Sequence, residues 1–286
     1  MKEPCRASTV VSIVSIPHLS VDLSNLMASH ESRDIRLSCP WGSVLGLEWG
    51  EPGNLHILAV HGWMDNCNTF HFLGPALAAA GYHVVAFDLP GHGHSDPMPA
   101  GLHCYDLEFV SVLHRLVRKM GWDQGKYSLL GHSLGGGICL VYTAAFPDQV
   151  ELLVMLDITF LPVRPGTPLE FQPRLRASVL GGSNLEDRGK TKPAKLYKNR
   201  EEAVQRMLQP ALYMKERRVQ QTITERSAWI LLERGLREVD NGFIFTRDPR
   251  MSVPSLNNLS WEDQLQLAQK VSLECFVLIY LARLVP

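Results

Sequence analysis

Long apolar runs, a surplus of charge of one sign and paired cysteines are all missing from this sequence. No apolar run reaches the length of about 20 residues that a bilayer-spanning helix needs. The run CFVLIYL at residues 275–281 is better suited to a buried strand. The 286 residues carry a formal net charge of -1, so there is no electrostatic reason for a nucleic-acid or acidic-membrane partner. We therefore expect no nucleic-acid partner, no stable membrane insertion and a small-molecule substrate, and the oligomeric state stays open.

The six cysteines are scattered and form no CxxC pair, which is typical of a chain in a reducing compartment. They stand at positions 5, 39, 67, 104, 139 and 275. We expect an intracellular location, cytoplasmic by preference, with a peroxisomal or other organelle location left open. Residues 1–34 predict a poorly ordered leader. Lys2 and Arg6 before a short apolar stretch resemble an organelle signal, whereas Glu3 and Pro4 argue against a secretory one.

Buried strands alternate with helices over residues 35–160. A strand pair turns at Trp41 and Gly42, and near-continuous apolar runs of strand length follow. The expected strands are 34–40, 43–50, 55–62, 83–88, 126–131 and 150–160, and the expected helices are 70–82, 107–122 and 135–147. This alternation predicts an α/β fold with a mostly parallel, doubly wound sheet, whose carboxyl edge collects the polar loops.

The pattern changes between residues 161 and 255. Residues 161–218 contain thirteen Lys or Arg against six Asp or Glu, but these charges are dispersed and lack interleaved aromatics. We therefore predict a mainly helical cap rather than a nucleic-acid surface, with a helix capped by Asn199 and a hairpin turning at 240–242. Residues 256–286 predict a return to the core through a helix opened by Ser260 and a strand at 274–281.

The sequence GHSLG at residues 131–135 matches G-x-S-x-G between a predicted strand and a predicted helix. The flanking glycines permit a tight turn that exposes Ser133 as a candidate nucleophile, with His132 beside it. The following helix directs backbone N–H groups at the site, which suits an oxyanion. A glycine-rich turn with an incidental serine is the alternative interpretation.

The sequence HGWMDN at residues 61–66 ends an earlier central strand. A strand-terminal His61-Gly62 pair lines the expected site, and the next residue can supply the other half of an oxyanion hole. We therefore predict that the backbone N–H groups of Trp63 and Leu134 face the same space.

The sequence FDLPGHGHS at residues 87–95 ends the next strand. Asp88 is expected to line the site. His92 and His94 invite assignment as metal ligands or as a base, but without a third ligand nearby a role in loop packing is the better interpretation. We predict no metal and no cofactor.

These three motifs, in this order, resemble the α/β-hydrolase superfamily. More narrowly, the sequences PWGSVLGLEWG, HGWMDNCNTF and ILLERGLREVDNGFIFTRDPR resemble the serine hydrolase-like (kraken-like) proteins of animals. The resemblance implies a serine hydrolase of ester-like or related acyl substrates, with a helical cap after the strand that ends near Asp157. It also implies the chain order nucleophile, acid, histidine.

No histidine follows Ser133, because all eleven histidines stand at or before position 132. The acid loop, last strand and histidine of the family pattern are missing, so we expect a C-terminally truncated form of the fold. Asp157 is either an alternative acid, as in some relatives, or a loop-shaping aspartate. A serine without an imidazole is a poor nucleophile. The alternatives are therefore a catalytically inactive binding or regulatory protein and a truncated isoform of an active enzyme.

Overall fold

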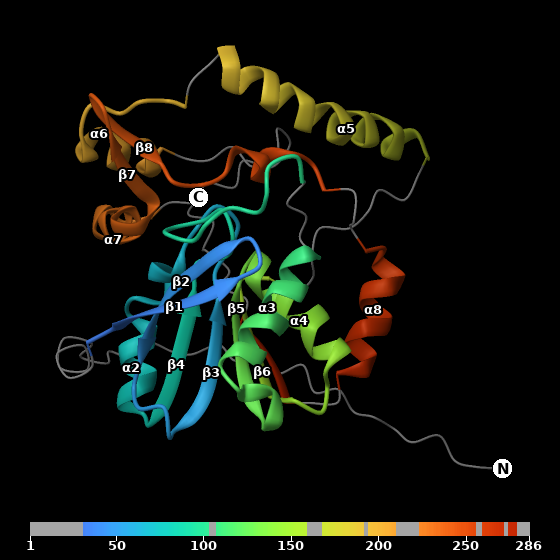
Figure 1. Ribbon diagram of the computed structural model, residues 1–286. Coiled ribbons are helices and arrows are strands. Elements are labelled where there is room, and N and C mark those ends of the chain that lie inside the picture. Colours follow the sequence, from blue (N-terminus) through green and yellow to red (C-terminus); the bar gives the residue numbers. More distant parts are fainter. Residues whose placement is uncertain are drawn as a thin grey trace, which may run out of the picture.

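A seven-stranded sheet in the order β1-β2-β4-β3-β5-β6-β9 forms the centre of the molecule (Figure 1). The computed structural model describes residues 31–102, 107–158, 168–191, 194–209, 223–255, 259–271 and 274–278. The strands are β1 (Arg33–Cys39), β2 (Gly42–Trp49), β3 (Leu55–Val60), β4 (Tyr82–Phe87), β5 (Tyr127–His132), β6 (Val150–Leu156) and β9 (Glu274–Leu278). Because β3 pairs in parallel with both β4 and β5, these three strands end at the same edge of the sheet.

The first two strands form the antiparallel hairpin that the sequence predicts, with its turn before Gly42. β2 also runs antiparallel to β4, whereas the remaining pairs of neighbouring strands are parallel. The mostly parallel sheet is therefore confirmed.

Apolar side chains cover both faces of the sheet. In β3, Leu58 and Val60 pack in one apolar cluster and Ile57 and Ala59 in another, because alternate residues of a strand point to opposite faces. The helices of the core are α2 (Leu73–Ala79), α3 (Glu108–Lys119), α4 (Leu134–Ala145) and α8 (Trp261–Lys270). Figure 1 shows α2 on one side of the sheet and α3, α4 and α8 on the other, which confirms the doubly wound arrangement.

Helix α3 shows why these segments become helical. Its buried residues recur at the spacing of one helix face: Phe109, Val112, Leu113, Leu116 and Val117. Burying each such side chain contributes about 1.5–3 kcal/mol to folding. The helix ends at Lys119, shortly before Gly121 adopts the left-handed conformation with φ 72°.

Helix α5 (Pro168–Thr191) was not predicted as a separate element from the sequence. The prolines and glycines of this stretch hide any apolar period, and Pro173 lies inside the helix. The face of α5 that packs against residues 253–255 consists of small residues and a long polar one instead of apolar residues. Ser178 is fully buried, a Cβ on Gly181 would lie 2.7 Å from Val253 Cγ1, and Arg174 Nε donates to the Ser255 carbonyl at 3.1 Å. A search for apolar periodicity cannot find a face of this kind.

Residues 197–209 and 223–245 form a small second cluster. It contains α6 (Arg200–Leu208), α7 (Glu225–Gly235), β7 (Leu236–Val239) and β8 (Gly242–Phe245). The Asn199 side chain accepts a hydrogen bond from the Glu202 N–H at 2.9 Å, and Asn241 adopts φ 71° in the hairpin turn, so both predicted signals are confirmed. The buried residues of this cluster are Tyr197, Ala203, Val204, Ala228, Leu232 and Leu236.

The chain returns to the core as predicted. Ser260 and Asp263 form a reciprocal capping box at the start of α8, and β9 pairs in parallel with β6. Three short 3-10 helices complete the described elements: η1 (Cys67–Phe70), η2 (Trp122–Gln124) and η3 (Pro249–Ser252). None of the helices within the described ranges is both long and apolar enough to cross a bilayer. The predictions for residues 1–30 and 279–286 lie outside the described residues.

Candidate active site

Ser133 occupies a strained turn between β5 and α4. Its backbone has φ 48° and ψ -123°, a conformation that L-residues rarely adopt. The Ser133 N–H donates to the Leu156 carbonyl at 2.9 Å, which ties the turn to the end of β6. Such strain at one serine, held by its surroundings, is typical of a nucleophile turn.

The glycines on both sides of Ser133 are required by close packing. A Cβ on Gly131 would collide with the Gly136 backbone, and a Cβ on Gly135 would collide with the Val60 carbonyl oxygen. Helix α4 can therefore begin directly against the ends of β3 and β5. Larger residues at these two positions would push the helix away from the sheet.

The first N–H group of α4 belongs to Leu134. Within the part of the chain that the structure describes, this N–H has no hydrogen-bond acceptor. The first N–H groups of a helix lack intrahelical partners and carry the positive end of the helix dipole. The Leu134 N–H therefore lies at the positive end of the helix, and its role in an oxyanion hole stays a prediction.

The loop after β3 lies against this turn. A Cβ on Gly62 would lie 3.3 Å from Ser133 Cβ and 3.1 Å from His132 Nδ1, so Gly62 brings the chain before Trp63 directly beside the serine. The Trp63 indole Nε1 donates to the Met251 carbonyl at 3.0 Å, which holds the side chain against the apolar cluster that contains Met251. The loop and the turn thus share one edge, as predicted from the order of the motifs.

His61 does not line an open space, contrary to the sequence-based expectation. Its ring is 0% exposed, and its two nitrogens contact the Gly62 carbonyl at 2.8 Å and the Leu89 N–H at 2.9 Å. Burial lowers the pKa of His61, although Asp65 and Asp88 oppose this effect. The ring is therefore neutral near pH 7 and is not available as a base for Ser133.

His92 is also fully buried, 5.0 Å from His61 between ring centroids. Its Nε2 accepts from the Met64 N–H at 3.2 Å, and its Nδ1 lies 3.3 Å from the Pro90 carbonyl. Burial lowers the pKa of His92 to about 3. Both nitrogens contact backbone groups, as expected for a histidine that packs a loop.

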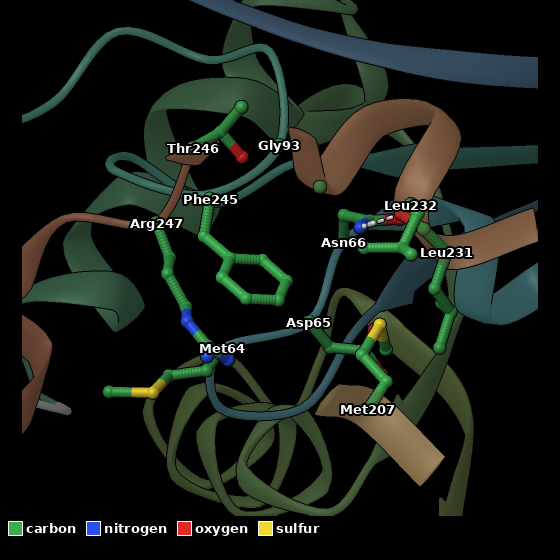
Figure 2. A pocket seen from close by; sticks show the side chains of 11 residues that line it. Met64, Asp65, Asn66, Gly93, Met207, Leu231, Leu232, Phe245, Thr246 and Arg247 are labelled. Atoms are coloured by element: carbon green, nitrogen blue, oxygen red, sulfur yellow. Dashed lines mark hydrogen bonds between the residues drawn. The ribbon is translucent and has the colours of Figure 1, made fainter. Parts of the chain in front are cut away.

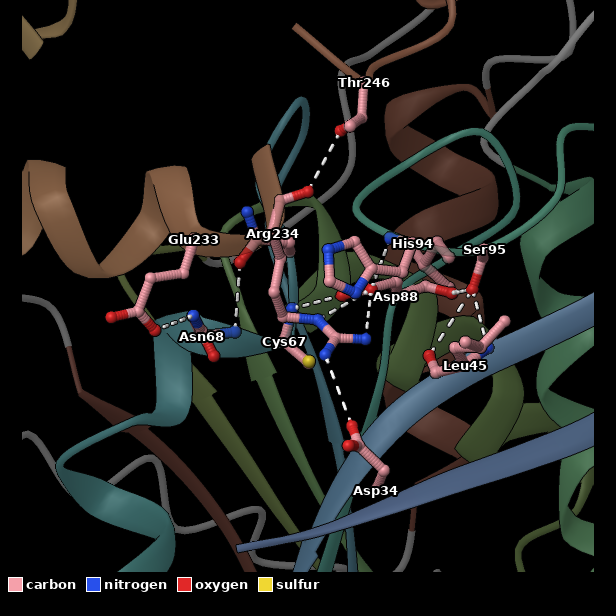
Figure 3. Close-up of polar contacts among 12 residues, drawn as sticks. Asp34, Leu45, Cys67, Asn68, Asp88, His94, Ser95, Glu233, Arg234 and Thr246 are labelled. Carbon is pink, nitrogen blue, oxygen red and sulfur yellow. Dashed lines mark hydrogen bonds and ion pairs between the residues drawn. The ribbon is translucent and has the colours of Figure 1, made fainter. Parts of the chain in front are cut away.

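Asp88 was expected to line the site, but it connects three buried segments instead (Figure 3). It is 0% exposed, its Oδ1 accepts from the Cys67 N–H, and its Oδ2 accepts from the His94 N–H, both at 2.8 Å. Arg234 of α7 donates to Oδ2 from Nε at 2.9 Å and from Nη2 at 2.8 Å. Burial alone would raise the pKa of Asp88, but Arg234 and the hydrogen bonds outweigh burial and lower it.

Sequence reasoning did not single out Arg234, Asn66 and Asn68, which join α7 to the loops beside the site. The Asn66 side chain donates to the Leu231 carbonyl at 2.9 Å, and that of Asn68 to the Ile230 carbonyl at 2.7 Å. Both asparagines therefore bind the C-terminal half of α7. The only available signal was their position after the strand-terminal His-Gly, because their partners lie more than 160 residues away.

His132 and Asp157 lie beside Ser133 without completing a proton relay. His132 Nδ1 is buried against Gly62 and has no hydrogen-bond partner in the described ranges. Asp157 follows β6, is exposed and adopts φ 56°. No described residue hydrogen-bonds to Ser133 Oγ, so the described contacts hold only the backbone of Ser133, through its N–H bond to the Leu156 carbonyl.

A cavity lies next to this edge, between the loop at Met64–Asn66 and the end of α7 (Figure 2). Its lining is mainly apolar, with Asp65 and Arg247 as charged members. The apolar residues are Met64, Met207, Leu231, Leu232 and Phe245. In the described segments no three His, Cys, Asp or Glu side chains are grouped to hold a metal ion.

A strained serine between a parallel strand and a helix, beside a His-Gly loop from the neighbouring strand, defines the class of α/β-hydrolases. The sequence model of the alpha/beta hydrolase fold family matches residues 56–214 of this chain. The serine hydrolase-like protein of Danio rerio is 30% identical over 267 residues, which cover 93% of this chain and 76% of that protein. A probable serine hydrolase of Drosophila melanogaster is 33% identical over 251 residues, covering 86% and 71%. The chain belongs to the α/β-hydrolase family, among its serine hydrolase-like proteins.

The solved structures agree on the fold. A hypothetical protein of Pseudomonas aeruginosa PAO1 superposes with a TM-score of 0.73 at 26% identity, over 85% of this chain and 80% of that one. The thioesterase domain from the curacin biosynthetic pathway shares the fold, with a TM-score of 0.68 at 19% identity over 86% and 82%.

Proposed function

We propose that Ser133 is the nucleophile of a hydrolase that acts on ester-like or related acyl substrates of small size. In this proposal Ser133 Oγ attacks the acyl carbon, and the N–H groups of Trp63 and Leu134 stabilise the negative charge on the acyl oxygen. The bond to the alcohol breaks, the alcohol leaves with the proton that Ser133 loses, and an acyl-serine forms. Water then hydrolyses the acyl-serine, which releases the acid and restores the Ser133 hydroxyl. The observation that carries the proposal is the strained backbone of Ser133 at the first turn of α4, directly beside Gly62.

The segments after β6 fit the role of a cap. In Figure 1, α5, α6, α7 and the β7–β8 hairpin lie beyond the carboxyl edge of the sheet, where the Ser133 turn is found. The apolar cavity at Met64 and Phe245 lies between the core loop and this region. We propose that the cap covers the substrate and that this cavity accepts an apolar part of it.

A binding protein without turnover is the second candidate. It is favoured by the contacts of the described residues, among which no imidazole hydrogen-bonds to Ser133 Oγ while His61 and His92 contact backbone groups. In our proposal Asp157 acts as the acid only together with a histidine, because the acid of a triad works by orienting the imidazole. An oxyanion hole and binding site without a complete triad retain about 10³–10⁴-fold catalysis over water.

Reaction with a fluorophosphonate probe, followed by mass spectrometry of the labelled peptide, tests the first candidate. We expect the probe to label Ser133, and Ser133→Ala to remove both the label and the hydrolysis of p-nitrophenyl butyrate. Ser183→Ala is the matched control, because Ser183 is exposed on α5. Absence of labelling and of serine-dependent hydrolysis in folded wild-type protein would contradict the hydrolase and leave the binding protein, to be tested by calorimetry with a non-hydrolysable ester analogue.

A further inference from the structure

His61 is a buried, polar side chain in the middle of the site that the proposed reaction does not use. It is 0% exposed, and it is the last residue before the Gly62–Trp63 peptide. Fully buried histidines are kept where their hydrogen bonds are needed, because an unpaired buried polar group costs about 1–3 kcal/mol. Its two bonds therefore indicate what it does.

The tautomer of His61 follows from its partners. Nε2 lies 2.9 Å from the Leu89 N–H, which can only donate, so Nε2 is the acceptor. In a neutral ring the other nitrogen then carries the proton. Nδ1–H therefore donates to the Gly62 carbonyl oxygen, at 2.8 Å. The Leu89 N–H in the loop after β4 thus determines that His61 donates, rather than accepts, the hydrogen bond at Nδ1 in the loop after β3.

The carbonyl that His61 binds belongs to the same peptide unit as the Trp63 N–H. A trans peptide is planar, so fixing its oxygen also fixes the opposite direction of its N–H. The Gly62 oxygen has a second donor, the Asp65 N–H, at 3.2 Å. Two donors on one oxygen determine the rotation of this peptide about the chain axis.

His92 supports the next peptide in the same loop. Its Nε2 accepts the Met64 N–H at 3.2 Å, and Met64 is held at φ 59°, a strained value for a residue other than glycine. The ring lies edge-on to His61 with an interplanar angle of 62°. The two imidazoles thus form a buried pair that holds consecutive peptides of the loop.

We propose that His61 is a positioning residue that aims the Trp63 N–H at the oxyanion through the Gly62 carbonyl, with His92 as its support. This inference rests on the proposed function of Ser133 and names a residue that acts through another group. Misplacement of one donor by about 1 Å can reduce an enzymatic rate about 100-fold, so the hydrogen bond from Nδ1 is expected to matter more than the volume of the ring.

Three variants separate the two hydrogen bonds from packing. His61→Asn keeps an amide N–H near the position of Nδ1, so it can still donate to Gly62. His61→Gln keeps an acceptor near the position of Nε2 for Leu89 but lacks the donor to Gly62, and His61→Leu lacks both. We expect His61→Asn to react with the fluorophosphonate probe within about threefold of wild type. His61→Gln and His61→Leu should lose about 10- to 100-fold in this rate and in kcat, with KM changed little.

Two measurements do not depend on turnover. Nitrogen-15 NMR of wild type should show the proton of His61 on Nδ1. Amide hydrogen exchange of residues 63–65 should be at least tenfold faster in His61→Leu than in His61→Asn. His71→Asn is the control, because His71 lies after η1 outside the site.

The outcomes distinguish the two proposals. If wild type does not react at Ser133, the proposed hydrolase fails, but the tautomer and exchange data still decide the role of His61. Positioning is overturned if the proton is found on Nε2, or if exchange at residues 63–65 is the same in His61→Leu as in His61→Asn. It is also overturned if wild type reacts at Ser133 and His61→Gln reacts as fast as His61→Asn.

Discussion

The segment after β6 has two halves: one is helix α5, and the other contains α6, α7 and the β7–β8 hairpin. Different kinds of contact hold these two halves to the core. The α7 half is joined through buried polar groups: Arg234 binds Asp88, and Asn66 and Asn68 bind two carbonyls in the C-terminal half of the helix. Helix α5 packs on η3 and residues 253–255, and it leaves Val179 58% exposed.

This difference assigns different roles to the two halves. Asp88 also binds the Cys67 N–H, so the position of α7 and that of the candidate oxyanion loop depend on the same carboxylate. Helix α5 has no described hydrogen bond to that loop. We therefore infer that the α7 half belongs to the rigid floor of the site, whereas α5 is the part of the proposed cap that can move at low cost. Four measurements test this comparison.

The largest effect is expected from Arg234→Met. It leaves the buried Asp88 carboxylate without its guanidinium partner, and removing one member of a buried ion pair costs about 3–5 kcal/mol. Denaturant unfolding should show this loss, and the double variant with Asp88→Asn should recover part of it. Arg176→Met on exposed α5 is the matched control, expected within about 0.5 kcal/mol of wild type. Equal losses in Arg234→Met and Arg176→Met would remove the distinction between the halves.

Acid should weaken the core loops next to α7 through the buried His92, which lies in the loop after β4 and accepts the Met64 N–H. The pKa of His92 is lowered by burial from 6.5 to about 3. Between these pH values the unfolded chain binds a proton that the folded chain does not. The contribution of His92 to the free energy of unfolding is therefore complete above pH 6.5 and is lost as the pH falls toward 3. The slope is about 1.4 kcal/mol per pH unit for this histidine.

His92→Gln should flatten this part of the curve of unfolding free energy against pH. Asp88 acts in the same direction only at lower pH, because its folded pKa lies below 3.8. Neither α5 nor α7 contributes a histidine, since none follows position 132, so this part of the pH dependence comes from the core loops alone. Identical pH dependence in wild type and His92→Gln between pH 6 and 4 would contradict the buried, neutral state of this ring.

A smaller loss is expected from Asn68→Ala. The substitution removes the hydrogen bond to the Ile230 carbonyl, for which a typical net contribution is about 1 kcal/mol. The loss should come with faster amide exchange in the last turn of α7. Gln205→Ala on the exposed surface of α6 is the control and should leave that exchange rate unchanged.

The smallest effect is expected on α5 itself. Val179→Ser should change the free energy of unfolding by less than about 0.5 kcal/mol, because the side chain is largely exposed. Native-state hydrogen exchange should be faster in α5 than in α7, since fewer buried contacts hold it. Protection of α5 equal to that of the buried strand β6 would show that α5 is anchored as firmly as the core.

Local signals predicted the parts of the fold that depend on near neighbours. Asn199 and Ser260 were recognised as caps because each accepts a hydrogen bond from a residue three positions later. Helix α5 was missed because its inner face uses Ser178 and Gly181 for close approach rather than a period of apolar residues. The oxyanion role of Trp63 and Leu134 and the acid role of Asp157 stay predictions.

By itself, the sequence determined the turn that carries Ser133. Glycines at 131 and 135 allow the close approach that this turn needs, since any Cβ there would collide with the Gly136 backbone or with the Val60 carbonyl at the end of the neighbouring strand. Only the tertiary structure decided what the buried polar atoms do. Asp88 and Arg234 are 146 residues apart in the chain, and the Leu89 N–H that sets the His61 tautomer comes from another strand end. A buried polar group must find a partner wherever the fold supplies one, so its role depends on atoms that its own sequence neighbourhood does not contain.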